Sequence, residues 1–223
     1  RLPAGSVYVL IILLALTVSF KSVRNNYQPI RLLRQDDSME RYGNDIMASI
    51  PPNAIVTLGD DTSLNAFSYL YYVQRKRQDI TFLDYNLFDR EFYRNRMMKR
   101  YPALKFPAYA GVDTLSDYIE KFILANYADT PVISGGFVIP AQAFWVPHGL
   151  VSVFYKTLDE IPERAIIIEK NVRLWNSFSN PLDGLLGTYR HLLLEDILSG
   201  YAQRRLIFAQ ALVYYKKHDE AKN

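Results

Sequence analysis

The sequence predicts an α/β protein with an N-terminal transmembrane helix, a small, mainly parallel sheet with crossover helices, and a C-terminal, tetratricopeptide-like helical hairpin. Three observations predict this fold: an uncharged run near the N-terminus, short apolar runs alternating with amphipathic stretches after residue 50, and a helix-forming C-terminus. We expect these boundaries: 1–24 for the transmembrane helix, 25–40 for a connector, 41–180 for the α/β domain and 181–223 for the C-terminal helices.

The composition limits the class of protein. The 223 residues are 49% hydrophobic and 22% charged, which is enough apolar sequence for a buried core. The formal net charge of +3 comes without a long basic run, so nucleic acid is not an expected partner. The chain has no cysteine, which excludes a disulfide framework and a thiolate metal site.

The first element is the apolar run at residues 6–20, dominated by Leu, Ile and Val. A helix that crosses a hydrocarbon layer needs roughly 20 residues, so this run spans a membrane only together with its neutral neighbours. Membrane lipid is therefore an expected partner, and a buried core helix is the alternative. A signal peptide fits less well, because no clear small-residue cleavage site follows. Since the chain begins with Arg rather than Met, we expect it to continue a longer protein or to be a processed product.

The soluble domain opens with a βαβ pattern. Pro51 and Pro52 stop a preceding short helix, and residues 54–58 form an apolar run typical of a strand buried on both faces. Gly59 allows a sharp exit into an amphipathic helix, and residues 80–85 form the next, parallel strand. The helix presents one buried stripe at intervals of three and four residues: Leu64, Phe67, Leu70 or Tyr71, and Gln74.

The remaining elements follow from similar patterns. Asp113 is expected to cap a second crossover helix at residues 114–128, and residues 130–138 and 148–156 are expected to form further strands, giving a sheet of about four. From residue 185 to 217 the chain is helix-forming, with a break expected at Gly200. Its apolar stripes cannot all be buried by one hairpin, so we expect a protein partner on the C-terminal helices.

The acidic residues at the strand ends are the candidate site. Asp60 and Asp61 follow the first strand and Asp84 follows the second, so all three are expected near the carboxyl edge of the sheet, where open α/β folds bind ligands. A structural role is nevertheless the expected one, because Asp60 can cap the helix that begins near Thr62. The two carboxylates are adjacent and no glycine-rich phosphate loop accompanies them, so we expect no bound metal.

Other reaction centres find no support in the sequence. Ser134 does not stand in the G-x-S-x-G pattern of a nucleophile elbow. His148 precedes Gly149 at an expected turn, and His191 and His218 lack metal-ligand spacing. We therefore expect no catalytic residue and no cofactor in this chain.

A family resemblance accompanies these patterns. The stretch "IPPNAIVTLGDDTSLNAFSYLYYVQRKRQDITFLDYNLF" is similar to the start of the post-membrane domain of a bacterial multi-span family of unknown function, related to the eukaryotic transmembrane O-mannosyltransferase. The similarity rests on residues 50–54, 131–134 and 146–154, and on these single positions: Gly59, Asp60, Thr62, Tyr69 or Tyr71, Arg77, Asp79, Pro147, Gly149 and Leu150. Ala211, Tyr214 or Tyr215, and Ala221 resemble the start of a tetratricopeptide-like repeat.

The resemblance implies a function without a reaction centre in this chain. It implies the last membrane helix and extracytoplasmic domain of a GT-C-like, polyprenyl-phosphate-sugar-dependent glycosyltransferase, whose catalytic carboxylate lies in a multi-span part that is absent here. The family's "DND" and "FP" are reduced to "DDTSLN". The cations Lys21, Arg24, Arg31 and Arg34 point the other way, because the positive-inside rule would place the domain in the cytoplasm.

Three hypotheses therefore compete. The first is an accessory domain of a membrane glycosyltransferase that recognises an acceptor or a partner. The second is a single-pass, membrane-anchored scaffold subunit of a larger complex. The third is an independent α/β enzyme or small-ligand binder that works at the Asp60 and Asp84 edge.

Overall fold

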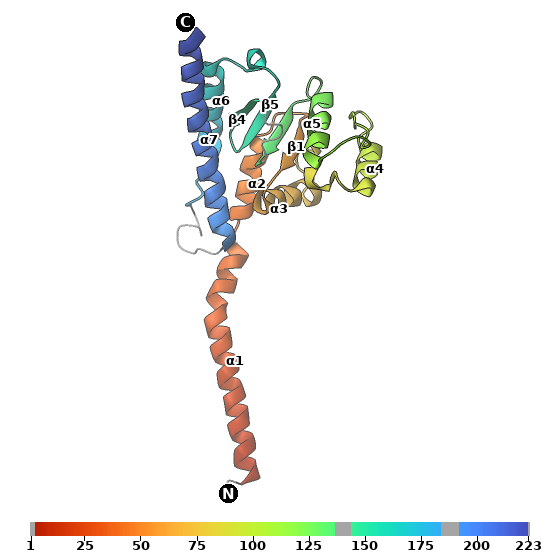
Figure 1. The fold of residues 1–223 in the computed structure, drawn as a ribbon. Coiled ribbons are helices and arrows are strands. Elements are labelled where there is room, and N and C mark those ends of the chain that lie inside the picture. The colour runs from red at the N-terminus through yellow and green to blue at the C-terminus, as the bar shows by residue number, and fades with distance from the viewer. Residues whose placement is uncertain (1–2, 137–143, 184–191, 223) are drawn as a thin grey trace.

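The computed structural model describes residues 3–136, 144–183 and 192–222. A long helix stands away from a domain in which helices cover both faces of one sheet (Figure 1). The elements in chain order are α1 (Ala4–Gln35), α2 (Ser38–Ala48), β1 (Ile55–Leu58), α3 (Asp61–Ser68), the π-helical turn η1 (Tyr69–Val73), β2 (Thr81–Phe82), the 3-10 turn η2 (Tyr85–Leu87), α4 (Glu91–Arg100), α5 (Leu115–Asn126), β3 (Val132–Gly135), β4 (Phe144–His148), β5 (Val151–Tyr155), the 3-10 turn η3 (Leu158–Glu160), α6 (Arg164–Ser177) and α7 (Leu192–Lys222).

Helix α1 carries the predicted apolar run and is long and apolar enough to cross a membrane. Its large apolar side chains are exposed, so nothing in the described part of the domain covers them. The helix continues through Pro29 to Gln35. Eleven residues of the expected connector therefore lie in α1 and three lie in α2, and only Asp36 and Asp37 separate the two helices.

The sheet has the strand order β2-β1-β3-β5-β4. Strands β2, β1 and β3 are parallel, as predicted for the βαβ unit, with Ile55 opposite Thr81 and Val132. The hairpin β4-β5 adds two antiparallel strands, so the sheet is mixed and has five described strands where about four mainly parallel ones were predicted. Strand β4 escaped prediction because it contains Pro147, which edge strands tolerate and central strands do not.

Two apolar clusters fill the two faces of the sheet. One cluster packs α2, α3 and α7 against Val56, Leu58 and Ile133. The other packs α5 and the η2–α4 region against Ile55, Val132 and Phe154. Burial on both faces explains why β1 and β3 lack a polar-apolar alternation.

The C-terminal helices differ from the predicted hairpin. Helix α7 runs without a break through Gly200, so the predicted break there is wrong. A Cβ at position 200 would lie 2.4 Å from the Tyr42 hydroxyl, so the glycine allows α7 to approach α2 closely. Helix α6, which the sequence patterns had not indicated, contributes Trp175, whose ring lies 6.3 Å from that of Tyr201 on α7. The tetratricopeptide-like character stays a prediction.

Polar contacts hold α2 in place at both sides. The buried Asp45 carboxylate accepts hydrogen bonds from the Tyr201 hydroxyl at 2.5 Å and the Ser179 amide at 3.1 Å, which ties α2 to α7 and to the segment after α6. Burial raises the pKa of Asp45 despite these two bonds. Just after Asp45, at the C-terminal end of α2, the Arg77 guanidinium donates to the carbonyls of Met47 and Ile50 and pairs with Asp79. The Arg77 hydrogen bond lowers the pKa of Asp79.

The cap of α5 is one residue later than predicted. The Thr114 hydroxyl accepts from the Asp117 amide and the Asp117 carboxylate accepts from the Thr114 amide, both at 3.1 Å. This reciprocal pair forms a capping box, so the N-cap of the helix is Thr114 rather than Asp113.

Candidate functional site

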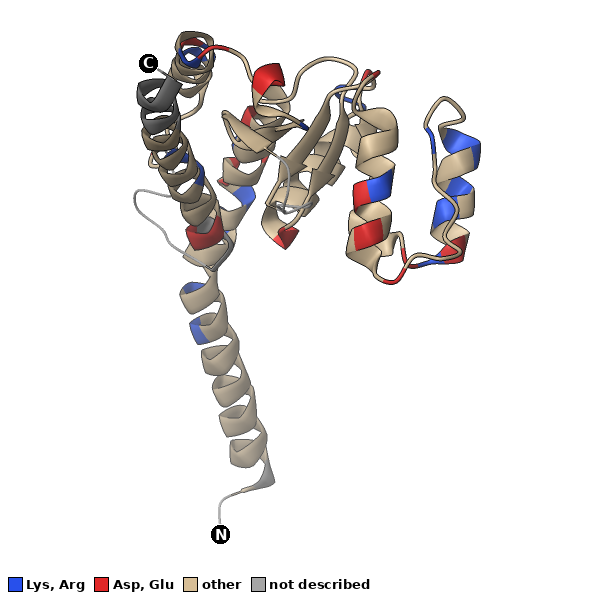
Figure 2. Ribbon diagram, turned by 45° about the horizontal axis from the view of Figure 1, so that its top comes forward, with Lys and Arg blue, Asp and Glu red and all other residues tan. Residues whose placement is uncertain are grey.

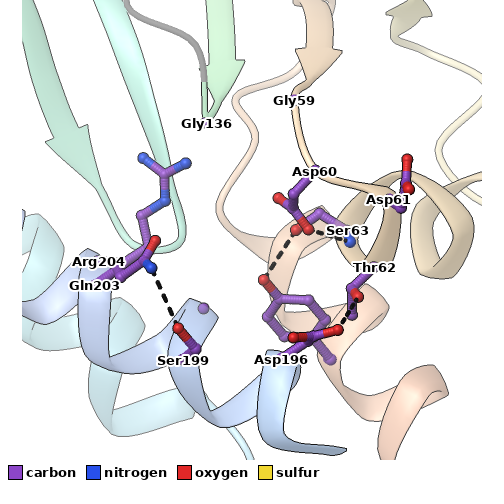
Figure 3. A pocket seen from close by; sticks show the side chains of 12 residues that line it. Gly59, Asp60, Asp61, Thr62, Ser63, Gly136, Asp196, Ser199, Gln203 and Arg204 are labelled. Atoms are coloured by element: carbon purple, nitrogen blue, oxygen red, sulfur yellow. Dashed lines mark hydrogen bonds between the residues drawn. The ribbon is translucent and has the colours of Figure 1, made fainter. Parts of the chain in front are cut away.

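A pocket of about 440 Å³ lies at the carboxyl edge of β1 and β3. Its volume falls within the ~300–1,000 Å³ typical of small-molecule sites. The end of β1 and the first turn of α3 form one side, and the second and third turns of α7 face them across the opening (Figure 3). The lining residues are Tyr42, Gly59, Asp60, Asp61, Thr62, Ser63, Gly136, Asp196, Ser199, Gly200, Gln203 and Arg204.

Asp60 is the N-cap of α3. Its backbone is extended, and one carboxylate oxygen accepts the Ser63 amide at 2.7 Å. The first amides of a helix lack partners within the helix, and an acidic side chain at this point satisfies one of them. The cap agrees with the structural role expected for Asp60. The second carboxylate oxygen of Asp60 remains at the pocket, whereas Asp61 is exposed and directed away from Arg204 (Figure 3).

The floor of the pocket is a set of hydroxyl contacts between α2, α3 and α7. The Tyr42 hydroxyl and the Ser63 hydroxyl lie 2.9 Å apart. Burial raises the pKa of Tyr42, so the phenol stays neutral and keeps its proton as a donor. The Thr62 hydroxyl donates to Asp196 at 3.4 Å, a long bond across the two walls. These contacts fix α3 against α7 at the base of the site.

Arg204 is the only basic side chain among the residues that line the pocket. Its guanidinium points toward the β1 and β3 ends (Figure 3), and Nη2 lies 3.8 Å from where a Cβ on Gly136 would be. Among the described residues Arg204 has no hydrogen bond or ion pair, although it interacts electrostatically with Asp60. Burial lowers the pKa of Arg204. A half-buried guanidinium of this kind has donors available for a ligand.

The charges of the lining indicate which ligands fit. The lining contains three carboxylates, from Asp60, Asp61 and Asp196, and the single guanidinium of Arg204. This excess of negative charge opposes a phosphate group. Within the described residues, no group of three His, Asp or Glu side chains is placed to hold a metal ion. Carboxylate acceptors beside amide and guanidinium donors suit a neutral ligand with several hydroxyl groups.

The structure separates the predicted acidic residues. Asp84 follows β2 and caps η2 by accepting the Asn86 amide at 3.0 Å, and it does not line the pocket. His148 ends β4 and directly precedes the turn at Gly149 and Leu150, and its Nδ1 lies 2.6 Å from the Ser49 carbonyl. Burial lowers the pKa of His148. His191 and the side chain of His218 lie outside the described residues.

Besides Tyr42 on α2, the lining side chains that sequence reasoning missed come from α7: Asp196, Ser199, Gln203 and Arg204. They recur at intervals of three, four and one, so they share one face of the helix. This polar stripe was visible in the sequence, but α7 is separated from Asp60 by more than a hundred residues. No local pattern indicates that the two segments meet.

Replacing Asp60 tests the capping role. Asp60→Ala is expected to lower the free energy of unfolding by about 1 kcal/mol, because the Ser63 amide loses its acceptor. Asp60→Asn is expected to cost less, since its amide oxygen still accepts. Chemical unfolding of the full chain in detergent micelles measures both, and Asp61→Ala is the control. Equal losses for Asp60→Asn and Asp60→Ala would contradict the cap.

Comparison with known proteins relates part of the chain to one group of enzymes. No protein-family model and no solved structure matches the chain. It is 30% identical over 93 residues to "Protein O-mannosyl-transferase TMEM260" of Mus musculus, a match that covers 42% of this chain and 13% of that protein. It is 27% identical over 97 residues to "Protein O-mannosyl-transferase tmem260" of Dictyostelium discoideum, covering 43% of this chain and 12% of that protein. The chain therefore spans about an eighth of the length of these curated relatives, and the similarity supports a relation to protein O-mannosyl-transferases.

Proposed function

We propose that this chain is the membrane-anchored, extracytoplasmic part of a glycosyltransferase-like protein that uses a polyprenyl-phosphate sugar. In this proposal the chain is the C-terminal piece of a bacterial multi-span protein, and sugar transfer takes place in the multi-span part. The α/β domain recognises the acceptor or a partner protein. The partial similarity to O-mannosyl-transferases supports the reaction class, and the apolar α1 supports the anchor.

The pocket between α3 and α7 carries the acceptor role. A hydroxyl-bearing acceptor both donates and accepts hydrogen bonds, which matches the carboxylates of Asp60 and Asp196 and the donors of Gln203 and Arg204. A sugar donor that carries phosphate meets an excess of carboxylates there. The charge of the pocket thus favours the acceptor side of the reaction over the donor side.

Peptide binding tests this role. The probes are a serine- and threonine-rich peptide and the same peptide with one α-mannose on a threonine. The full chain in detergent micelles is expected to bind at least one of them saturably. Gln203→Ala combined with Arg204→Ala is expected to weaken that binding roughly tenfold or more, because a hydrogen bond to a charged group contributes ~1.5–3 kcal/mol. Titration calorimetry measures both.

The matched control is Arg96→Ala, which removes an exposed cation from α4, on the far side of the domain from α7 (Figure 1). Its binding is expected to equal that of the unchanged chain. The acceptor role is wrong if neither peptide binds, or if the pocket variant binds as tightly as the control.

A scaffold role is the second candidate, and one observation favours it. Helix α7 buries Ile197 and Tyr201 against the domain but exposes large apolar side chains farther along. Leu206 and Val213 are each 58% exposed, and Ile207 is 37% exposed. An apolar surface of this kind is typical of a protein-protein contact. A partner on the C-terminal helices, as the sequence predicts, would use this surface.

A further inference from the structure

The second half of α1 has a composition that the membrane span alone does not explain. Residues 21–35, called the stem here, follow the apolar run and contain Lys21, Arg24, Arg31 and Arg34. All four side chains are exposed. The whole of α1 contains no Asp or Glu, and Figure 2 shows basic but no acidic colour along it. The stem is therefore a purely cationic segment that stands between the apolar run and the domain.

The four cations share one face of the stem. Together with Tyr27 they recur at intervals of three, three, four and three residues, the spacing of a single stripe on an α-helix. Tyr27 is 58% exposed and also belongs to a neighbouring apolar stripe with Val23 and Ile30, which are 64% and 56% exposed. The opposite face is uncharged: Ser22, Asn25, Asn26, Pro29 and Leu33.

The length of α1 places this face near the membrane surface. Its 32 residues extend for roughly 48 Å at 1.5 Å per residue. The hydrocarbon core needs about 30 Å of this length, and a bilayer with its headgroups is about 40–45 Å thick. An upright helix would carry its last turn, with Arg34, beyond the headgroups. Membrane helices tilt by about 20° on average, and a tilt toward the cationic face lowers Arg31 and Arg34 to the phosphates.

We propose that the cationic stripe of the stem lies against anionic phospholipid headgroups, with α1 tilted toward that face. Lys and Arg beside a membrane span are attracted to an anionic surface, and a tyrosine between them suits the boundary between headgroups and hydrocarbon. A second copy of the chain is a poor occupant, because the same four cations on each copy repel one another. This inference needs only that α1 spans a membrane and is independent of the function proposed above.

A fluorescent label at the end of the stem tests the contact. The chain has no cysteine, so Gln35→Cys provides a single labelling site one helical turn beyond Arg31, on the cationic face. The labelled full chain is inserted into vesicles of phosphatidylcholine alone or mixed with phosphatidylglycerol, and uninserted chain is removed by alkaline extraction. A phospholipid with a spin-labelled headgroup then quenches any label at headgroup depth. We expect stronger quenching in the vesicles that contain phosphatidylglycerol.

Charge variants show whether the stem cations cause the difference. Arg31→Gln combined with Arg34→Gln is expected to abolish the difference in quenching between the two vesicles, and 1 M salt is expected to do the same by screening. Arg96→Gln combined with Lys99→Gln removes the same charge from α4 and is expected to preserve it. Equal quenching in both vesicles, or a difference that survives the Arg31 and Arg34 substitutions, would overturn the proposal.

Discussion

Replacing Leu13 and Leu14 by Asp is expected to release the chain from membranes. The two leucines lie near the middle of the apolar run and are 57% and 64% exposed, with no cover from the described part of the domain. On insertion scales each acidic side chain at the centre of a membrane helix costs about 3 kcal/mol, so the pair costs about 6 kcal/mol. Alkaline extraction of membranes, followed by quantification of the chain in pellet and supernatant, measures the release.

The control for this experiment keeps the added charge and changes its depth. Asn25→Asp combined with Gln28→Asp adds two carboxylates to the same helix beyond the apolar run. This variant is expected to stay in the pellet, because its carboxylates reach the aqueous interface. If the variant with Leu13→Asp and Leu14→Asp fractionates like the unchanged chain, that result contradicts a membrane span by α1.

Gly149→Ala is expected to destabilise the domain by about 3 kcal/mol. Gly149 has a φ of +64°, a conformation that costs an L-residue roughly 1–2 kcal/mol. A Cβ there would lie 2.4 Å from the Ser49 hydroxyl and 2.9 Å from Phe178 Cζ. The buried Ser49 hydroxyl donates to the Asp45 carbonyl and accepts the Leu150 amide, so it cannot move without breaking hydrogen bonds. Overpacking of this kind adds roughly 1–3 kcal/mol.

Gly111→Ala separates the two causes. Gly111 has a φ of +76°, but no atom lies within 4 Å of the position that a Cβ would take. Its substitution is expected to cost only the conformational part, roughly 1–2 kcal/mol. Chemical unfolding in micelles compares the two variants with the unchanged chain. Equal losses would show that contact with Ser49 and Phe178 contributes nothing.

The parts of the fold that the sequence predicts well are those specified by local pattern. The run from Ala54 to Leu58 and the capping side chain of Asp60 lie within a few residues of each other, so strand, cap and helix can be inferred together. Gly200 shows the opposite case. Glycine is a poor helix former, which favoured a break, but the close packing of Tyr42 on α7 requires the absence of a side chain there.

Of the two walls of the candidate site, only the wall formed by β1 and α3 could be predicted from the sequence. Asp60 could be placed at the carboxyl edge because strand direction follows from the βαβ pattern. Arg204 and Gln203 could not, because their position depends on how α7 docks on α2 and α3. That docking is specified by contacts between distant residues, such as Tyr201 with Asp45, which leave no periodic signal in the sequence.

The short connection between α1 and α2 links the pocket to the long apolar helix. Only Asp36 and Asp37 separate α1 from α2, and the Ser38 amide donates to the Asp36 carboxylate at 2.9 Å across this joint. Helix α2 in turn carries Tyr42, whose ring supports α7 at Gly200 and whose hydroxyl contacts Ser63 on α3. Helix α2 therefore connects α1 directly to both walls of the pocket.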